Sequence, residues 1–481
     1  MMGQMNLTAI LPELVIVVTL FIVSMFDAFT QGRKLVAGII AVLGLLTGMG
    51  TSIYLWGNKI MGFSNMIAID EFSLIIFMIV MLSGVITILV ALDYVDRFEP
   101  DGGHFYILIL SAILGMMFII SATNMIVLVL GLELMSFSVY PLVGFTRDRS
   151  ASLEGSMKYL LLGAYATAFL LYGIALVYSV LGTTNLYLIA KSLATRQDLM
   201  TNIIMMGGVA FILIGLGFKV AVVPFHAWAP DAYEGAPAPV TGFMATAVKT
   251  ASFAAIIKLV IIVFNVYKVP VSDALWVLSA LTMLVGNVVA ISQKNVKRML
   301  AYSSIAHAGY IVVGLVTGSV YGMSAAIFYL IAYTFTTTGA FAIVTYLEKK
   351  DGTGNELSDY SGLSKTHPVI SLMMAIFLLS LSGIPPTAGF LAKFYVFSAA
   401  ISNGYVGLAI FGIFTSIISL YYYLRVVYAM YFEEPEIQIQ TPVPAGISIG
   451  IIIAIWGVFQ FGVLPSELIH IAVQSINSLL R

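Results

Sequence analysis

Ionisable side chains stand inside long apolar runs of this sequence, where they could carry protons or other ions. Lys219 and Lys249 lie in two neighbouring runs, and Lys393 lies in a third one further along the chain. A charged side chain at the centre of a membrane helix costs about 2.5–3.5 kcal/mol on insertion scales, so such residues usually serve an ion or proton path. The sequence therefore predicts a row of protonatable groups at membrane depth.

A proline follows the first of these lysines in the stretch GFKVAVVPFHAWAPDAYEGAPAPVTGFMATAVK, residues 217–249. Pro224 comes five residues after Lys219 (224 − 219 = 5). A proline inside a membrane helix removes a backbone donor and frees a carbonyl, so the helix breaks or kinks there. Broken backbone at membrane depth is tolerated only where protein or water lines it. We therefore expect an ion path at this break.

A second break is predicted at the run Gly383-Ile384-Pro385-Pro386, which precedes Lys393. The two broken spans, about 203–235 and about 369–400, are the seventh and the twelfth. They lie an odd number of spans apart, so two copies of one unit would face opposite ways, as in many transporters. The lysines do not match between the copies, because one precedes its proline and the other follows it. The predicted inverted repeat therefore depends on the breaks.

Glu133 lies about ten residues into the predicted fifth span, in the run VLVLGLELMSFSVYPLVG. One interpretation is a structural ion pair that locks two helices together. The other is a carboxylate that tunes a nearby lysine, because burial disfavours a charged lysine whereas an opposite charge favours it. The two interpretations overlap, because an ion pair that opens and closes is itself a switch.

Two histidines are further candidates for proton transfer, because histidine changes its charge near neutral pH. His226 follows the first break, and it could carry a proton between the break and the eighth helix. His307 lies on the tenth span, beside the hydroxyls of residues 302–304 in KRMLAYSSIAHAGYI. These hydroxyls favour a relay, although a lone histidine on a membrane helix also serves as a hydrogen-bond partner between helices.

Other basic residues within the spans have plainer interpretations. Lys158 lies near the inner end of the sixth span, where it could extend to the interface or pair with Glu154 one turn earlier. Lys258 and Arg425 lie towards the ends of their spans. We expect Lys258 to be an anchor at the membrane interface, and Arg425 to be an anchor or part of an ion pair.

Composition places the chain in the membrane. It has 481 residues, of which 60% are hydrophobic and 9% charged, whereas soluble domains have about a quarter of their residues charged. The net charge of −1 argues against a nucleic-acid partner. The absence of cysteine excludes disulfides and iron–sulfur clusters within this chain. No metal-binding or phosphate-binding motif appears, so we expect no cofactor here.

Apolar runs long enough to cross a bilayer recur about 14 times. The first is interpreted as a retained helix, because MMGQMNLTAILPELVIVVTL has neither a basic start nor a cleavage site. We expect a single membrane domain over 1–481, with three N-terminal helices in 1–103, two repeats in 104–266 and 267–431, and a C-terminal helix and tail in 432–481. Basic residues are enriched in the loops of one side, which favours both termini outside.

Four stretches resemble a known family, namely GLELMSFSVYPLVGF, FKVAVVPFHAWAPDAYEGAPAPVTGFMATAVKTASF, KRMLAYSSIAHAGY and SGIPPTAGFLAKFYVF. They are similar to the antiporter-like membrane subunits of respiratory complex I, and most similar to the bacterial N type (the B type of chloroplasts and cyanobacteria). The resemblance covers about two thirds of the chain, and the HAWAPDAYEGAPAPVT stretch is its most specific part. The resemblance implies an all-α polytopic protein with two inverted five-helix repeats and discontinuous helices 7 and 12.

The resemblance also implies roles for matching positions. Glu133 would be the fifth-helix glutamate, and Lys219, Lys249 and Lys393 the lysines of helices seven, eight and twelve; His226, His307 and Lys158 would be further polar positions. The chain would pass protons while quinone is reduced elsewhere in the complex, in a bacterial inner membrane. Quinone, NADH or another donor, flavin and iron–sulfur clusters would belong to other subunits, and the partners would be M-, K- and J-type membrane subunits. Lysine rather than glutamate at 393 fits the N type.

Two alternatives stay open at this point. The first is a subunit of a multisubunit sodium/proton antiporter, which shares the lysines but differs around the YEGAP loop and would show sodium-dependent transport. The second is a structural membrane subunit whose charges only hold helices together. Such a subunit would tolerate an apolar replacement of its ion pairs.

Overall fold

The computed structural model describes residues 6–30, 33–98, 103–264, 268–349, 351–435 and 442–480. Within these ranges the chain is almost entirely helical, and thirteen helices are long and apolar enough to cross a membrane. The predicted twelfth span is divided into two helices of 15 residues each, α16 and α17. With this discontinuous span added, the expected number of about 14 is confirmed.

The elements up to the first break comprise the N-terminal helices, a short hairpin and most of the first repeat. They are η1 (Leu7–Ile10), α1 (Leu11–Phe29), α2 (Lys34–Tyr54), β1 (Ile60–Gly62), β2 (Ile67–Ile69), α3 (Glu71–Phe98), α4 (Gly103–Ser121), α5 (Met125–Val143), α6 (Ser150–Leu181), α7 (Leu186–Thr195), η2 (Gln197–Thr201) and α8 (Ile203–Val220). Strands β1 and β2 pair antiparallel. This hairpin and the short helix α7 were not predicted.

The remaining elements complete the first repeat and form the second repeat and the C-terminal part. They are α9 (Trp228–Gly235), α10 (Ala238–Phe243), η3 (Met244–Val248), α11 (Lys249–Lys258), η4 (Leu259–Phe264), α12 (Lys268–Ile291), α13 (Val296–Val316), α14 (Val320–Leu347), η5 (Leu357–Tyr360), α15 (Leu363–Thr366), α16 (Pro368–Ser382), α17 (Ala388–Ser402), α18 (Val406–Phe432), α19 (Ala445–Val463) and α20 (Ser466–Leu480). Here η3 and η4 are π-helical, and α10 to η4 form one span. The C-terminal helix α20 packs against α3 and α14.

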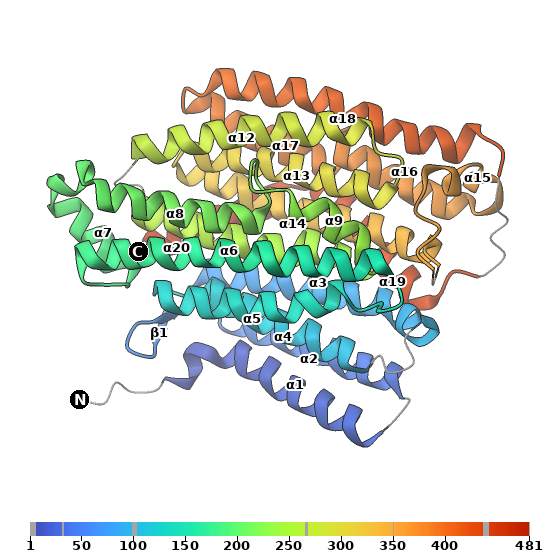
Figure 1. The fold of residues 1–481 in the computed structure, drawn as a ribbon, viewed down its shortest axis with the longest axis horizontal. Helices are drawn as coiled ribbons and strands as arrows, with labels where there is room; N and C mark the ends of the chain where they lie inside the picture. The colour runs from blue at the N-terminus through green and yellow to red at the C-terminus, as the bar shows by residue number, and fades with distance from the viewer. Residues whose placement is uncertain are drawn as a thin grey trace.

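The helices lie side by side, with α1 and α2 at one edge of the bundle and α12 and α18 at the opposite edge (Figure 1). The span α10–η4 and helix α14 are buried along their whole apolar length. A helix that is apolar on every side can be surrounded by lipid or by other helices, and here other helices surround both spans. These two spans therefore form the centre of the bundle, and they hold Lys249 and Tyr329, one of the hydroxyl partners of His307.

The two breaks share a backbone feature, a left-handed C-cap, although the positions of their lysines differ. Helix α8 ends at Ala221 (φ 58°) and α16 ends at Gly383 (φ 87°), so both C-caps are left-handed. A left-handed C-cap terminates a helix, and a residue other than glycine seldom adopts it. Pro224 and Pro386 each follow their cap by three residues. The discontinuity predicted for helices seven and twelve is confirmed.

The two repeats also share a backbone connection at the start of their second helix. Asn124 caps α5 and Asn295 caps α13, each with its side-chain oxygen, and the two positions are 171 residues apart (295 − 124 = 171). The same offset relates the hydrogen bonds that flank them. These are Met125 N–H to Thr184 O (2.9 Å) and Leu186 N–H to Thr123 O (2.9 Å) in the first repeat, and Val296 N–H to Asn355 O (2.7 Å) and Leu357 N–H to Lys294 O (2.9 Å) in the second.

Some predicted boundaries fall beyond what the structure describes. The limit between the repeats at 266–267 lies outside the described residues, as do residues 1–5 and Arg481 at the termini. The division into segments and the outside position of both termini therefore stay predictions.

Candidate functional site

The first two predicted residues meet between α5, α6 and α8. The Lys219 ammonium, 1% exposed, donates to Ser136 Oγ at 2.8 Å. Ser136 lies three residues after Glu133 on α5, and Glu133 Oε1 accepts a hydrogen bond from Thr167 Oγ1 at 2.7 Å. Among the described residues, Glu133 forms no ion pair with Lys219. The predicted carboxylate and lysine are thus neighbours that hydroxyl side chains separate.

Aromatic rings surround Lys219 on the side of the break. Its ammonium lies 5.8 Å from the ring centres of Tyr140 and Tyr159, which favours a cation. The rings of Tyr159 and Trp228 stack at 4.3 Å, and Trp228 Nε1–H donates to Phe218 O at 2.9 Å. This bond closes α9 back onto the end of α8. Within the described part of the chain, the Tyr159 hydroxyl has no hydrogen-bond partner, so this side of Lys219 is largely apolar.

Lys249 lies at the centre of the bundle, on the span α10–η4. Its ammonium is 2% exposed and donates to both the carbonyl and the hydroxyl oxygen of Ser304, each at 2.6 Å. Ser304 belongs to α13 of the second repeat. Lys249 therefore joins the two repeats through neutral oxygens.

His307 lies one turn after Ser304 on α13 and has a hydroxyl at each ring nitrogen. Its Nδ1 is 2.7 Å from the Tyr329 hydroxyl, and its Nε2 is 3.2 Å from the Tyr423 hydroxyl. The Tyr423 hydroxyl also hydrogen-bonds Ser303 Oγ. A neutral imidazole donates from one nitrogen and accepts at the other. The ring can therefore pass a proton between the two tyrosines by exchanging tautomers.

Lys393 lies on α17, directly after the second break. Its ammonium is 6% exposed and donates to Ser382 O (2.8 Å) and Ser416 Oγ (2.7 Å). It also lies 5.1 Å from the ring centre of Tyr310, whose hydroxyl accepts from Asn287 Nδ2 at 2.9 Å. A crevice of about 510 Å³ between α17 and α18 reaches the Lys393 side chain. The lysine therefore has a polar inner face and an opening at the bundle surface.

Similarity to known proteins identifies the family to which the chain belongs. A family described as "NADH:quinone oxidoreductase/Mrp antiporter, TM" matches residues 122–419, which is more than half of the chain. The chain belongs to this family. NADH-quinone oxidoreductase subunit N of Trichlorobacter lovleyi is 41% identical over 476 residues, covering 98% of this chain and 97% of the relative. Subunit N 1 of Herpetosiphon aurantiacus is also 41% identical, covering 96% and 95%.

Solved structures agree with this assignment. A chain of respiratory complex I from Thermus thermophilus has a TM-score of 0.81 at 31% identity, covering 95% of this chain and 98% of that chain. A chain of the Mrp complex from Dietzia has a TM-score of 0.86 at 20% identity, covering 99% and 98%, and this likeness concerns the fold. The chain is thus an antiporter-like membrane subunit of the N type, as the sequence motifs predicted.

Lys158 stands apart from the row of lysines in this antiporter-like subunit. It forms salt bridges with Glu154 and Asp231, both at 2.7 Å, which confirms the predicted pairing with Glu154. Arg298 of α13 binds Asp231 and Glu234, also at 2.7 Å. This network ties α6 to α9 beyond the break and to the second repeat. The sequence indicated only the contact between Lys158 and Glu154, because the other members are far from Lys158 along the chain.

A second network without any predicted member lies at the start of the Lys249 span. The Glu348 carboxylate is buried and accepts from Lys297 Nζ (2.9 Å), Arg149 Nη1 (3.0 Å) and the Ala238 N–H (2.9 Å). Lys297 also donates to Ala236 O at 2.5 Å. Burial alone would raise the pKa of Glu348, but Lys297 and Arg149 outweigh it and hold the pKa below its ordinary value. An ionised pair thus fixes the link between α9 and α10.

Three further residues for which the sequence predicted roles are His226, Lys258 and Arg425. His226 is half-buried in the loop after α8, and its Nδ1 has no partner among the described residues. The interface anchor predicted at Lys258 is wrong, because its ammonium is 1% exposed and donates to Ile120 O and Ala122 O. Arg425 forms no ion pair among the described residues, and it donates to Ile291 O and Gln293 O at the end of α12. Both cations bind backbone carbonyls at the ends of other helices.

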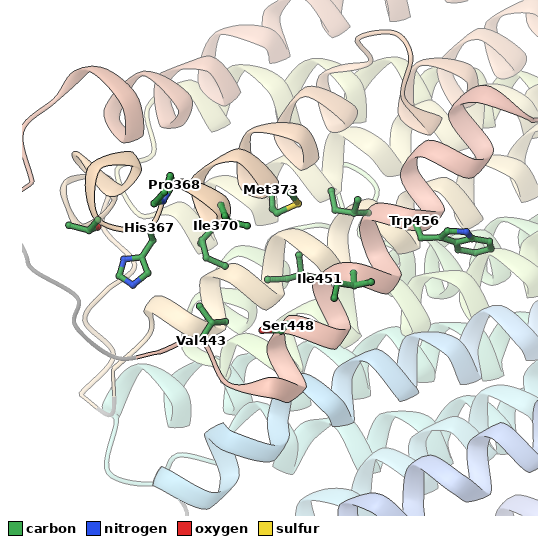
Figure 2. Close-up of a pocket in the computed structure, with 12 residues that line it drawn as sticks. His367, Pro368, Ile370, Met373, Val443, Ser448, Ile451 and Trp456 are labelled. Carbon is green, nitrogen blue, oxygen red and sulfur yellow. The ribbon is translucent and has the colours of Figure 1, made fainter.

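A separate apolar groove of about 630 Å³ runs between α16 and α19 (Figure 2). His367 and Pro368 line one end of it, and Trp456 lines the other. No lysine of the row lines this groove. Among the described residues, no group of three or more histidine or carboxylate side chains gathers as a metal site requires.

Proposed function

We propose that this subunit passes protons along Glu133, Lys219, Lys249 and Lys393 while quinone is reduced in other subunits of the complex. The observation that supports this proposal best is the partner of each buried lysine. Lys219, Lys249 and Lys393 donate to hydroxyl or carbonyl oxygens and to no carboxylate among the described residues. A lysine held by neutral oxygens can release its proton without leaving a buried anion unpaired.

The second repeat offers the clearer route for a proton. Ser304 receives the Lys249 ammonium, and His307 follows it on the same helix between Tyr329 and Tyr423. Tyr310 then leads to Lys393, where the crevice at α17 and α18 begins. Internal water would bridge the gaps that the side chains leave, as it does at other buried polar sites.

Lys249→Ala in the assembled complex tests the proposal. We expect the amount of complex in the membrane to stay normal, because only neutral oxygens lose a partner, while the protons pumped per quinone reduced fall by about a hundredfold or more. Proton uptake into inverted membrane vesicles during NADH oxidation measures this. Lys365→Ala is the matched control, because Lys365 is half-exposed and paired with Glu434 at the surface. Normal pumping by an assembled Lys249→Ala complex would remove Lys249 from the path.

The remaining parts of the proposal concern the surroundings of the chain. We infer M-, K- and J-type membrane subunits as its partners, and a bacterial inner membrane with both termini outside. The NADH or other donor site, flavin, iron–sulfur clusters and quinone belong to other subunits, so this chain contributes proton transfer without a redox centre of its own. The absence of cysteine supports this division, because iron–sulfur clusters need thiolate ligands.

A sodium/proton antiporter subunit is the second candidate, because the Mrp complex from Dietzia shares the fold over almost the whole chain. The identity of 20% there, against 41% for the subunit N relatives, favours the first proposal. Transport that depends on sodium in the absence of an electron donor would favour the second.

A further inference from the structure

Two cations occupy equivalent places in the two repeats. Lys258 of the first repeat donates to Ile120 O and, at 3.2 Å, to Ala122 O. Arg425 of the second repeat donates to Ile291 O at 2.9 Å and to Gln293 O. The accepting carbonyls are 171 residues apart (291 − 120 = 171 and 293 − 122 = 171). The asparagine caps of the two repeats have the same offset, so a cation binds carbonyls at the same backbone position in both repeats.

The carbonyls that accept hydrogen bonds from Lys258 and Arg425 lie at the C-terminal ends of α4 and α12. The last carbonyls of a helix have no intrahelical partner, and the negative end of the helix dipole favours a cation there. An unsatisfied carbonyl at membrane depth is costly. Capping explains why a donor stands at each place, but not why it comes from the fifth helix of the repeat rather than from a neighbour in sequence.

Each fifth helix also carries a residue of the proposed proton route. Lys258 follows Lys249 by nine residues on the span α10–η4 (258 − 249 = 9). Arg425 also follows by nine residues a member of the proposed route, Ser416 on α18 (425 − 416 = 9). Ser416 Oγ accepts a hydrogen bond from the Lys393 ammonium. Nine residues are two and a half turns, so each cation points away from the proton-carrying face. Each fifth helix is therefore held on both faces.

We propose that Lys258 and Arg425 are a matched pair of positioning residues that set the height and rotation of the helices bearing Lys249 and Ser416. This proposal rests on the proton-transfer role proposed above for Lys249 and Lys393. Arg425 also stands two residues after Tyr423, the hydroxyl partner of His307. Neither cation exchanges protons. The second repeat has an arginine at this place, and arginine stays protonated under all physiological conditions. A permanent positive charge with N–H donors is therefore enough to bind the two carbonyls.

The side chains around Lys258 suit a fixed cation. The Phe72 ring centre lies 5.8 Å from its ammonium, which favours the charged form. The two carbonyl oxygens accept its hydrogen bonds, and the residue is 1% exposed. Arginine can replace lysine in such a site because it presents several donors to carbonyl oxygens, as Arg425 does.

Exchange between lysine and arginine separates positioning from proton transfer. In the assembled complex we expect Lys258→Arg and Arg425→Lys to keep normal pumping per quinone reduced, whereas Lys258→Met lowers it roughly tenfold, because a misplaced reacting group loses up to about a hundredfold in rate. Lys249→Arg is the matched comparison, since arginine there keeps the charge but cannot release the proton. It should lower pumping about as strongly as Lys249→Ala.

Three results would overturn the proposal. One is a Lys258→Arg complex that pumps as poorly as Lys258→Met, which would make Lys258 a proton carrier. Another is normal pumping by Lys258→Met. The third is a Lys258→Arg chain that fails to assemble, because the site would then not accept the residue of the other repeat. If only Lys258→Met fails to assemble, the two exchange variants still decide. Normal pumping by Lys249→Arg would count against the proposed function and leave the comparison at Lys258 intact.

Discussion

Lys297 and Lys249 are both fully buried lysines that lie near the contact between the two repeats, yet they are held in opposite ways. Lys297 binds the Glu348 carboxylate at 2.9 Å, and Arg149 adds a second cation to the same carboxylate. Among the described residues, Lys249 binds the two oxygens of Ser304 and no carboxylate. A carboxylate keeps its lysine charged, whereas neutral oxygens leave the proton free to depart. The partner, and not the burial, therefore distinguishes a structural lysine from one suited to proton transfer.

The same helix serves both purposes. Lys297 and Ser304 are seven residues apart on α13, which is close to two full turns, so they lie on one face. Lys297 holds the chain at Ala236, just before the Lys249 span begins, and Ser304 receives the ammonium further along that span. The ionic contact thus supports the geometry of the neutral one.

Glu348→Ala should have the largest effect. It leaves Lys297 and Arg149 as buried cations without their counterion, and breaking a buried pair in this way costs about 3–5 kcal/mol. We expect little assembled complex in the membrane, measured as the amount of this subunit that migrates with its partners on a native gel. Glu434→Ala, at the exposed pair with Lys365, should change assembly little. Normal assembly of Glu348→Ala would show that Lys297 is held by other means.

The sequence revealed the fold and the lysines because both have strong signals. Apolar runs of span length, and proline beside charge, need no knowledge of the neighbours. The backbone match between the repeats could not be found in this way, because the carbonyls gripped by Lys258 and Arg425 carry no side-chain signature. Lys258 was misjudged for a related reason. A lysine nine residues after Lys249 is expected near the interface, but α3 and α4 cover it here.

The partners of the lysines were largely invisible in the sequence. Serine and tyrosine are ordinary residues in membrane helices, so Ser136 and Tyr310 gave no reason to be chosen. Asp231 and Arg298 pair across 67 residues, and only the folded chain brings them together. Ser304 was noticed as one of several hydroxyls near His307, but its contact with Lys249 joins the two repeats and depends on their packing.

His307→Phe should have the next largest effect, and it acts on the neutral route alone. Phenylalanine keeps the ring contacts with Tyr333 and Tyr329 but cannot carry a proton. General acid–base groups contribute about a hundredfold or more, so we expect normal assembly with strongly reduced pumping per quinone reduced. His367→Phe is a suitable control, because His367 lines the α16–α19 groove (Figure 2), which no lysine of the row lines. Unchanged pumping would exclude His307 from the route.

The smallest effects should come from single tyrosine hydroxyls, and they compare the two repeats directly. Tyr423→Phe removes a hydroxyl that contacts both His307 and Ser303, and one lost hydrogen bond is worth about 1 kcal/mol, or roughly fivefold in a rate. Tyr159→Phe removes a buried hydroxyl that has no partner in the described part of the chain, so it should leave the pumping rate within about twofold. Pumping rates measured in vesicles with equal amounts of assembled complex give both values. If Tyr159→Phe lowers the rate as much as Tyr423→Phe, water must reach the aromatic side of Lys219, and the first repeat would conduct protons as the second does.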